Sequence, residues 1–207
     1  MDTLPPCIEP LPVDFPGRAK FIDRIDASVA LGDPRAVTSA LRHALSELIR
    51  DAEVVLPAQV HAPIVEHYAR RELYRSPQHG YSVVAMTWGP GQGTPLHDHS
   101  GLWCVEGVWQ GELDITQFEL VEQQHERYRF LAAGGLHAGC GSAGSLIPPH
   151  EYHTIRNGSP DAIAISLHVY QAPLESCSRF APQEGDWFVR ECVTMRTDDC
   201  VPTASAA

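Results

Sequence analysis

One segment constrains this chain more than any other: residues 91–111, GQGTPLHDHSGLWCVEGVWQG, which contain the pair His97-x-His99. Residues two apart on a β-strand point to the same face, so both imidazoles project together if the segment is extended. Such a pair can coordinate a metal ion through two imidazole nitrogens, and His153 in IPPHEYHTIRN is the best candidate for a third ligand. The alternative is a pair of surface or core histidines that bind no metal.

Glycines and prolines at fixed offsets around these histidines favour the metal site. The spacing resembles the two signature motifs of the cupin superfamily, whose fold is a small double-stranded β-barrel with a central metal. The residues that carry the resemblance are Gly91, His97, His99, Gly111, Pro148, His153 and Asn157. Two positions depart from the motifs: Cys104 stands in place of the usual glutamate ligand, and His150 replaces a glycine. His150 is an alternative third ligand, although His153 fits the spacing to Asn157.

Composition limits the class of protein. A chain of 207 residues with 43% hydrophobic and 20% charged residues is typical of one soluble globular domain. No run approaches the roughly 20 apolar residues of a membrane span, and the acidic, proline-rich start is unlike a signal peptide, so we expect a cytoplasmic protein with no membrane partner. A net charge of -11 argues against nucleic acid as a partner. Six cysteines without a C-x-x-C pair indicate reduced thiols.

We expect a single domain with three regions: an arm and helices over 1–67, a barrel over 68–195 and a flexible tail over 196–207. Five prolines indicate an extended arm over the first nineteen residues. Apolar spacing predicts helices over 21–31 and 33–53, the second with an Asp33-Pro34 cap, and one more helical turn over 62–67. Short runs rich in Val, Ile, Tyr and Trp predict strands over 81–88, 102–109, 112–119, 128–131, 144–147, 153–156, 162–170 and 186–192. The fold class is therefore mainly β, with an α-helical N-terminal region.

A second polar group lies in ISLHVYQ, where Ser166, His168 and Tyr170 alternate with Leu167 and Val169. On a strand, the three polar side chains share one face. That face is either exposed to solvent or buried with its members hydrogen-bonded in series, which would make a proton relay beside a metal.

From Tyr68 to Phe180 the chain resembles the cysteine dioxygenases, non-haem iron enzymes of the cupin superfamily. The segments that carry the resemblance are WGPGQGTPLHDH, HDHSGLWC, ISLHVY and PLESCSRF. The resemblance implies that His97, His99 and His153 bind Fe(II), that Ser166, His168 and Tyr170 form a relay, and that Cys104 is the cysteine that becomes cross-linked to a tyrosine, here Tyr170, through a thioether. Most bacterial members have glycine in place of this cysteine.

The implied reaction is oxidation of a small thiol by O2 to a sulfinic acid. Three neutral imidazoles leave Fe(II) its full charge, so a substrate thiolate can supply the missing anion. Coordination lowers the pKa of the thiol, and O2 is activated next to the sulfur.

The substrate carboxylate needs a fixed cation. Tyr68 and Arg70 resemble the Tyr-x-Arg that holds it in cysteine dioxygenases, with Arg71 as the alternative if the register slips by one residue. In the related 3-mercaptopropionate dioxygenases glutamine replaces this arginine, and an arginine after the relay tyrosine takes over; Arg179 matches that residue. We favour L-cysteine because Arg70 is the more diagnostic difference, and 3-mercaptopropionate or another small thiol carboxylate is the alternative.

Two functions of other classes compete with this interpretation. One is a non-catalytic cupin that only binds a small ligand, but a binding pocket needs no proton relay beside a metal. The other is a cupin isomerase or hydrolase with zinc or manganese, which would normally keep the motif glutamate that Cys104 replaces. The sequence leaves the oligomeric state open.

Overall fold

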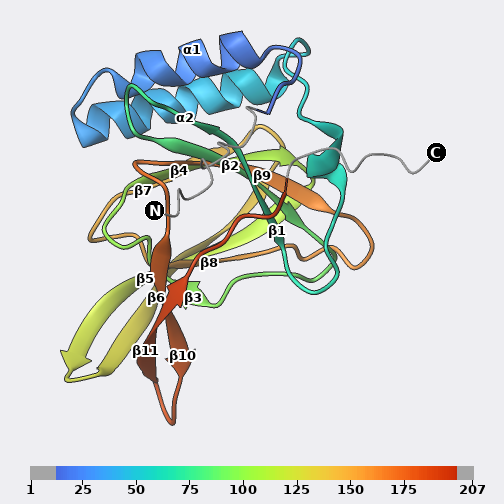
Figure 1. Cartoon of the computed structure of the whole chain (residues 1–207). Coiled ribbons are helices and arrows are strands. Elements are labelled where there is room, and N and C mark those ends of the chain that lie inside the picture. Colours follow the sequence, from blue (N-terminus) through green and yellow to red (C-terminus); the bar gives the residue numbers. More distant parts are fainter. Residues whose placement is uncertain (1–12, 200–207) are drawn as a thin grey trace, which may run out of the picture.

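The computed structural model describes residues 13–199 and confirms a mainly β fold with two N-terminal helices (Figure 1). Helices α1 and α2 and the 3-10 turn η1 come first, and the described strands follow. The elements are α1 (Arg18–Val29), α2 (Pro34–Arg50), η1 (Ala58–His61), β1 (Ala69–Arg75), β2 (Ser82–Trp88), β3 (Leu96–His97), β4 (Cys104–Gln110), β5 (Glu112–Gln124), β6 (Arg127–Gly139), β7 (Ala143–Leu146), β8 (His153–Arg156), β9 (Ala164–Tyr170), β10 (Ser176–Pro182) and β11 (Trp187–Thr194).

Helix α2 forms where its cap and apolar spacing predict it. The Asp33 side chain accepts a hydrogen bond of 3.0 Å from the backbone N–H of Ala36, and Pro34 occupies the first turn. The apolar stripe of this helix packs on β4 and β7. Helix α1 begins at Arg18, three residues earlier than expected, and residues 62–67 contain no helical turn.

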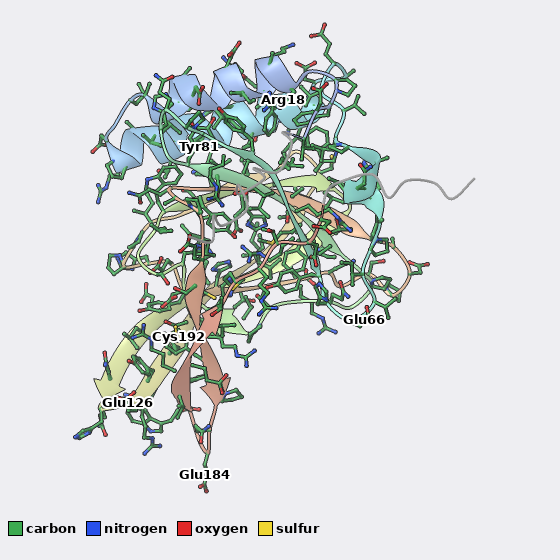
Figure 2. The ribbon with its side chains drawn as sticks, viewed as in Figure 1. Arg18, Glu66, Tyr81, Glu126, Glu184 and Cys192 are labelled. Carbon is green, nitrogen blue, oxygen red and sulfur yellow. The ribbon has the colours of Figure 1, made fainter. Side chains whose placement is uncertain are left out.

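Two antiparallel layers enclose the centre of the molecule. One is a five-stranded sheet in the order β1-β2-β9-β4-β7, and the other is a closed ring in the order β10-β11-β6-β5-β8-β3. Figure 1 shows both helices lying over the outer face of the five-stranded sheet. Tyr81, just before β2, donates a hydrogen bond of 2.6 Å to Asp26 of α1 and lies directly beneath the helices (Figure 2). The sheet therefore has two buried faces.

Strand β9 separates the two cores through its alternation. Its odd-numbered residues, including Leu167 and Val169, belong to the apolar core beneath the helices. Its even-numbered residues, including Ser166, His168 and Tyr170, face the interior and are at most 2% exposed. A solvent-exposed polar face, the alternative reading of ISLHVYQ, is therefore excluded.

Several elements differ from the sequence-based expectations. Strands β1 and β10 were not predicted, and β6 continues through the glycine-rich stretch at 132–139, where a turn was expected. That stretch pairs with β5 in a long hairpin. Figure 2 shows Glu126 at the tip of this hairpin and Glu184 at the tip of the β10 and β11 hairpin.

Both expected terminal segments extend partly beyond the described residues. Within the expected arm, Phe15 is buried and its ring packs edge-on against Phe21, whereas residues 1–12 lie outside the described part. Within the expected tail, Asp198 hydrogen-bonds to Arg70 of β1, and residues 200–207 lie outside the described part. Among the helices of residues 13–199, none is long and apolar enough to cross a membrane.

Candidate metal centre

Three histidines converge between the two layers. His97 on β3 is the register partner of His153 on β8, and His99 follows two residues after His97. Ring centroids are 4.4 Å apart for His97 and His153, 5.0 Å for His99 and His153, and 5.4 Å for His97 and His99. One nitrogen from each ring lies within 4.8 Å of the other two. The predicted trio is therefore a compact set of candidate metal donors.

Backbone contacts orient two of these rings. The Nδ1 atoms of His97 and His153 lie 3.1 Å from the Pro95 carbonyl oxygen and 3.0 Å from the Glu151 carbonyl oxygen. A carbonyl can only accept, so each Nδ1 carries the proton and each Nε2 has a lone pair free. His153 Nε2 is buried, and no group in the described part of the chain hydrogen-bonds to it. This arrangement is how proteins prepare imidazoles for a divalent metal, and the residues therefore fit one.

A buried carboxylate, Glu106, also reaches this centre. The sequence predicts no acid at this site because Cys104 occupies the motif position of the glutamate. The structure corrects that expectation: Glu106 Oε1 lies 3.4 Å from His153 Nε2 and 3.2 Å from His168 Nδ1. The sequence signal that could have revealed it is a single acid two residues after Cys104, and therefore on the same strand face, within the apolar run CVEGVW.

The Ser166 and His168 side chains are connected as expected, but the connection continues differently. Trp88 Nε1 donates to Ser166 Oγ at 2.9 Å, and Ser166 Oγ lies 2.8 Å from His168 Nε2. The serine oxygen accepts from the indole N–H, and its own proton is available to His168 Nε2; when it is donated there, a neutral His168 carries its proton on Nδ1, the side of Glu106. In the described residues no hydrogen bond joins His168 to Tyr170; their rings are stacked at 5.9 Å.

Cys104 and Tyr170 are direct register partners on the neighbouring strands β4 and β9. Both are buried, at 0% and 2% exposure, and the Tyr170 ring meets His99 edge-on at 5.4 Å. Burial raises the pKa of both the Cys104 thiol and the Tyr170 phenol, and the positive charge of Arg70 partly offsets the effect. The pair therefore lies beside the histidine cluster in its protonated form.

Arg70 lies on the interior side of β1. Its register partner is Met86, whose own partner on β9 is Ser166. The side chain is 5% exposed, Nη1 donates to the Arg196 carbonyl oxygen at 3.3 Å, and Nε has no partner among residues 13–199. Tyr68 is half-buried nearby and stacks on Trp88 at 4.6 Å. Arg70 therefore retains donors for an anionic group.

The other candidates occupy different surroundings. Arg71 faces away from the interior, where it donates to Thr87 Oγ1 at 3.2 Å and to the Ala62 carbonyl at 2.8 Å. Arg179 is the register partner of His97, yet its side chain is about half exposed and donates to Glu191 at 2.7 Å. His150 is exposed and is not among the clustered donors.

Burial and mutual repulsion control the charge of the centre. Burial lowers the pKa of His97 to about 3, with His153 adding to the decrease, and it lowers the pKa of His99 well below its usual value. Burial alone would raise the pKa of Glu106, but the neighbouring His168 and His153 outweigh it and hold that pKa well below its usual value. Burial likewise opposes a charge on His153, but Glu106 outweighs it and raises the pKa of His153. Glu106 and His153 therefore form a buried pair that favours a proton between them. An apolar cavity of about 50 Å³ lies behind Glu106 and His168.

Comparisons with known proteins indicate one family. The cysteine dioxygenase type I family model matches residues 62–183. Cysteine dioxygenase type 1 of Rattus norvegicus is 26% identical over 106 residues, which are 51% of this chain and 52% of that protein. The Bos taurus enzyme is 25% identical over 127 residues, 61% of this chain and 62% of that protein. The chain thus spans about half the length of most curated relatives that it matches.

A comparison with solved structures gives matches of low similarity. An uncharacterized conserved protein with a double-stranded β-helix domain from Klebsiella pneumoniae covers 67% of this chain and 92% of its own, with a TM-score of 0.44 and 16% identity. The family model covers more than half of the chain, including all three histidines, Glu106, Cys104 and Tyr170. The chain belongs to the cysteine dioxygenase type I family.

Proposed function

We propose that this protein is an Fe(II)-dependent thiol dioxygenase that oxidises L-cysteine with O2 to cysteine sulfinic acid. The observation that carries the proposal is the convergence of His97, His99 and His153 in a chain of this family. Bound iron would supply a Lewis acid that lowers the pKa of the substrate thiol and a centre at which O2 reacts. The thiol and O2 together give the sulfinic acid with both oxygen atoms retained, so no external electron donor is needed.

Arg70 supports a substrate that carries a carboxylate. A buried guanidinium with an unpartnered Nε offers the planar fork that a carboxylate matches. Its charge lowers the pKa of both Cys104 and Tyr170, and this proximity supports a substrate carboxylate bound beside the histidines. Tyr68, two residues before Arg70, stacks on Trp88.

3-Mercaptopropionate is the second candidate substrate, and Arg179 is the observation that favours it. The residue pairs in register with His97, so its backbone adjoins the metal centre. Its guanidinium is occupied by Glu191 and about half exposed, so it would have to leave that partner to reach a substrate. Arg70 requires no such rearrangement, and we therefore favour L-cysteine.

The test uses protein purified without oxygen and analysed for metal. Iron at one equivalent, O2 uptake on adding L-cysteine, and a sulfinate product with two oxygen atoms from O2 are the expected results. Slower turnover of 3-mercaptopropionate would support the substrate assignment, and faster turnover would reverse it. Zinc or manganese with no O2 uptake for any thiol would reject the dioxygenase and favour a cupin that only binds its ligand or catalyses another reaction.

A further inference from the structure

Glu106 creates a contact that the three-histidine centre does not explain. In a neutral His153 ring, Nε2 has the lone pair because the Nδ1 proton is committed to the Glu151 carbonyl. Glu106 Oε1 lies 3.4 Å from that nitrogen. Two acceptors facing each other in a buried site repel unless a proton or another cation lies between them. Among residues 13–199, neither atom has a hydrogen-bond partner.

We propose that Glu106 is a fourth protein ligand of the metal, so that the centre has three imidazoles and one carboxylate. This inference rests on the metal site of the proposed function. Donor atoms roughly 2.0 to 2.2 Å from one ion lie roughly 2.8 to 3.6 Å apart for angles between 90° and tetrahedral. The separation of 3.4 Å between Oε1 and Nε2 falls within that range. Glu106 also belongs to a second donor group, with His99 and Cys104, whose ligand atoms lie within 4.8 Å of one another. The two groups share His99, so binding of one ion by all three histidines and Glu106 requires the Glu106 side chain to move toward the histidine group.

The residues behind Glu106 support this role. Ligating carboxylates are themselves held by hydrogen-bond donors, and His168 Nδ1 lies 3.2 Å from Glu106 Oε1. A serine proton donated to His168 Nε2 leaves a neutral His168 protonated on that nitrogen, and Trp88 donates to the serine oxygen. The contact between His168 and Glu106 has the distance of a hydrogen bond but not its geometry in the structure. We expect a metal-bound Glu106 to accept a hydrogen bond from His168.

A carboxylate ligand changes the charge of the centre. Three neutral imidazoles leave a divalent ion with its double charge, whereas Glu106 cancels one unit and a bound thiolate cancels the other. We therefore expect this centre to favour the trivalent state of iron more than an all-histidine centre does.

Metal affinity tests the inference without thiol or O2. Affinity for Co(II) is measured by chelator competition for the wild type and for Glu106→Gln, Glu151→Gln, and His168→Gln. Glu151 is the matched control, because it is also a buried carboxylate near His153. Loss of an outer partner typically weakens affinity by about 10- to 100-fold, so loss of a charged ligand in Glu106→Gln should exceed about 100-fold. Glu151→Gln should remain within about 10-fold.

Two further measurements separate a direct ligand from an indirect one. In the Co(II) form of the wild type, a crystal structure should place Glu106 Oε1 about 2.0 to 2.2 Å from the ion, and the visible absorption should change in Glu106→Gln. An unchanged spectrum and affinity in Glu106→Gln would overturn the inference. Retained affinity with a higher KM only for L-cysteine would identify Glu106 as an ammonium-binding residue instead. Because no thiol is present, failure of dioxygenase activity would leave the affinity result intact.

Discussion

Cys104 and Tyr170 lie directly opposite each other on β4 and β9, with both side chains buried beside His99. Directly paired residues of antiparallel strands have Cβ atoms about 4.5 to 5.5 Å apart, which is within reach of a sulfur-to-ring bond. We predict that the two form a thioether during turnover, in which the S–H and one ring C–H are lost, a C–S bond forms and O2 accepts the two electrons.

Peptide mass spectrometry after turnover checks this prediction. The two peptides should appear joined and lighter by two hydrogens, and Cys104→Ser and Tyr170→Phe should each lack the joined species. If active enzyme never contains the joined peptides, the prediction is wrong and Cys104 only packs beside the site.

Removing Arg70 should affect substrates that it binds through their carboxylates. Loss of one partner from a buried, hydrogen-bonded charge pair costs about 2 to 4 kcal/mol, which is roughly 30- to 1000-fold in kcat/KM. Arg70→Gln should therefore lower kcat/KM for L-cysteine by that factor, and for 3-mercaptopropionate by less. Arg179→Ala is the comparison, and we expect it to leave L-cysteine turnover nearly unchanged because its guanidinium is paired with Glu191. The opposite pattern would assign the carboxylate to Arg179.

Asp198 should act through Arg70. Its carboxylate accepts a hydrogen bond of 2.8 Å from the Arg70 backbone N–H and contacts His67 at 3.0 Å. Asp198→Ala removes these contacts but leaves the guanidinium, so we expect KM for L-cysteine to rise about 5-fold with kcat preserved, corresponding to about 1 kcal/mol. Asp199→Ala is the matched control because Asp199 is exposed. Equal effects of the two variants would contradict a positioning role for Asp198.

Each of the three histidines should be needed for metal binding. We expect His97→Ala, His99→Ala and His153→Ala to lose bound iron and thiol oxidation together, since each removes one of three converging nitrogen donors. His150→Ala is the control, because His150 is exposed and three residues from His153. Metal analysis after anaerobic loading decides the matter: full iron content in His153→Ala and loss in His150→Ala would reverse the ligand assignment.

The sequence predicted those parts of the fold in which burial follows a regular period. Alternation over 164–170 indicated one polar face, and the structure buries that face against the interior. The Asp33 cap and the apolar stripe after it likewise predicted α2. Strand β1, ARRELYR, has the opposite character: four of its seven residues are charged, and pairing with β2 rather than an apolar run makes it a strand.

The site was predictable only where residue spacing encodes proximity. His97 and His99 share a face by their spacing, and the second motif located His153. Glu106 was missed because its proximity to His153 depends on how β4 in the sheet meets β8 in the ring. The family resemblance predicted a hydrogen bond from His168 to Tyr170. In the structure His168 instead lies beside Glu106, the single acid on β4, because the two residues are register partners.

Close packing of α2 on β4 gives a prediction about stability. Gly107 of β4 faces the helix, and a Cβ there would lie 2.8 Å from Ile49 Cδ1 and 3.4 Å from Leu45 Cβ. Its backbone is not in the left-handed region, so the backbone conformation does not require glycine. The missing side chain matters only because it lets α2 pack close to β4. Gly107→Val should therefore lower the free energy of unfolding by about 1 to 3 kcal/mol through overpacking.

Gly144 of β7 is the matched control, because a Cβ there would meet no atom within 4 Å. Gly144→Val should leave the free energy of unfolding unchanged or raise it by up to about 1 kcal/mol, since a side chain restricts the unfolded chain. Urea unfolding of both variants in the metal-free form measures the difference without a contribution from bound metal. Equal stability of the two variants would mean that α2 can move away from β4 at little cost, because only the Gly107 variant forces the helix and the strand apart.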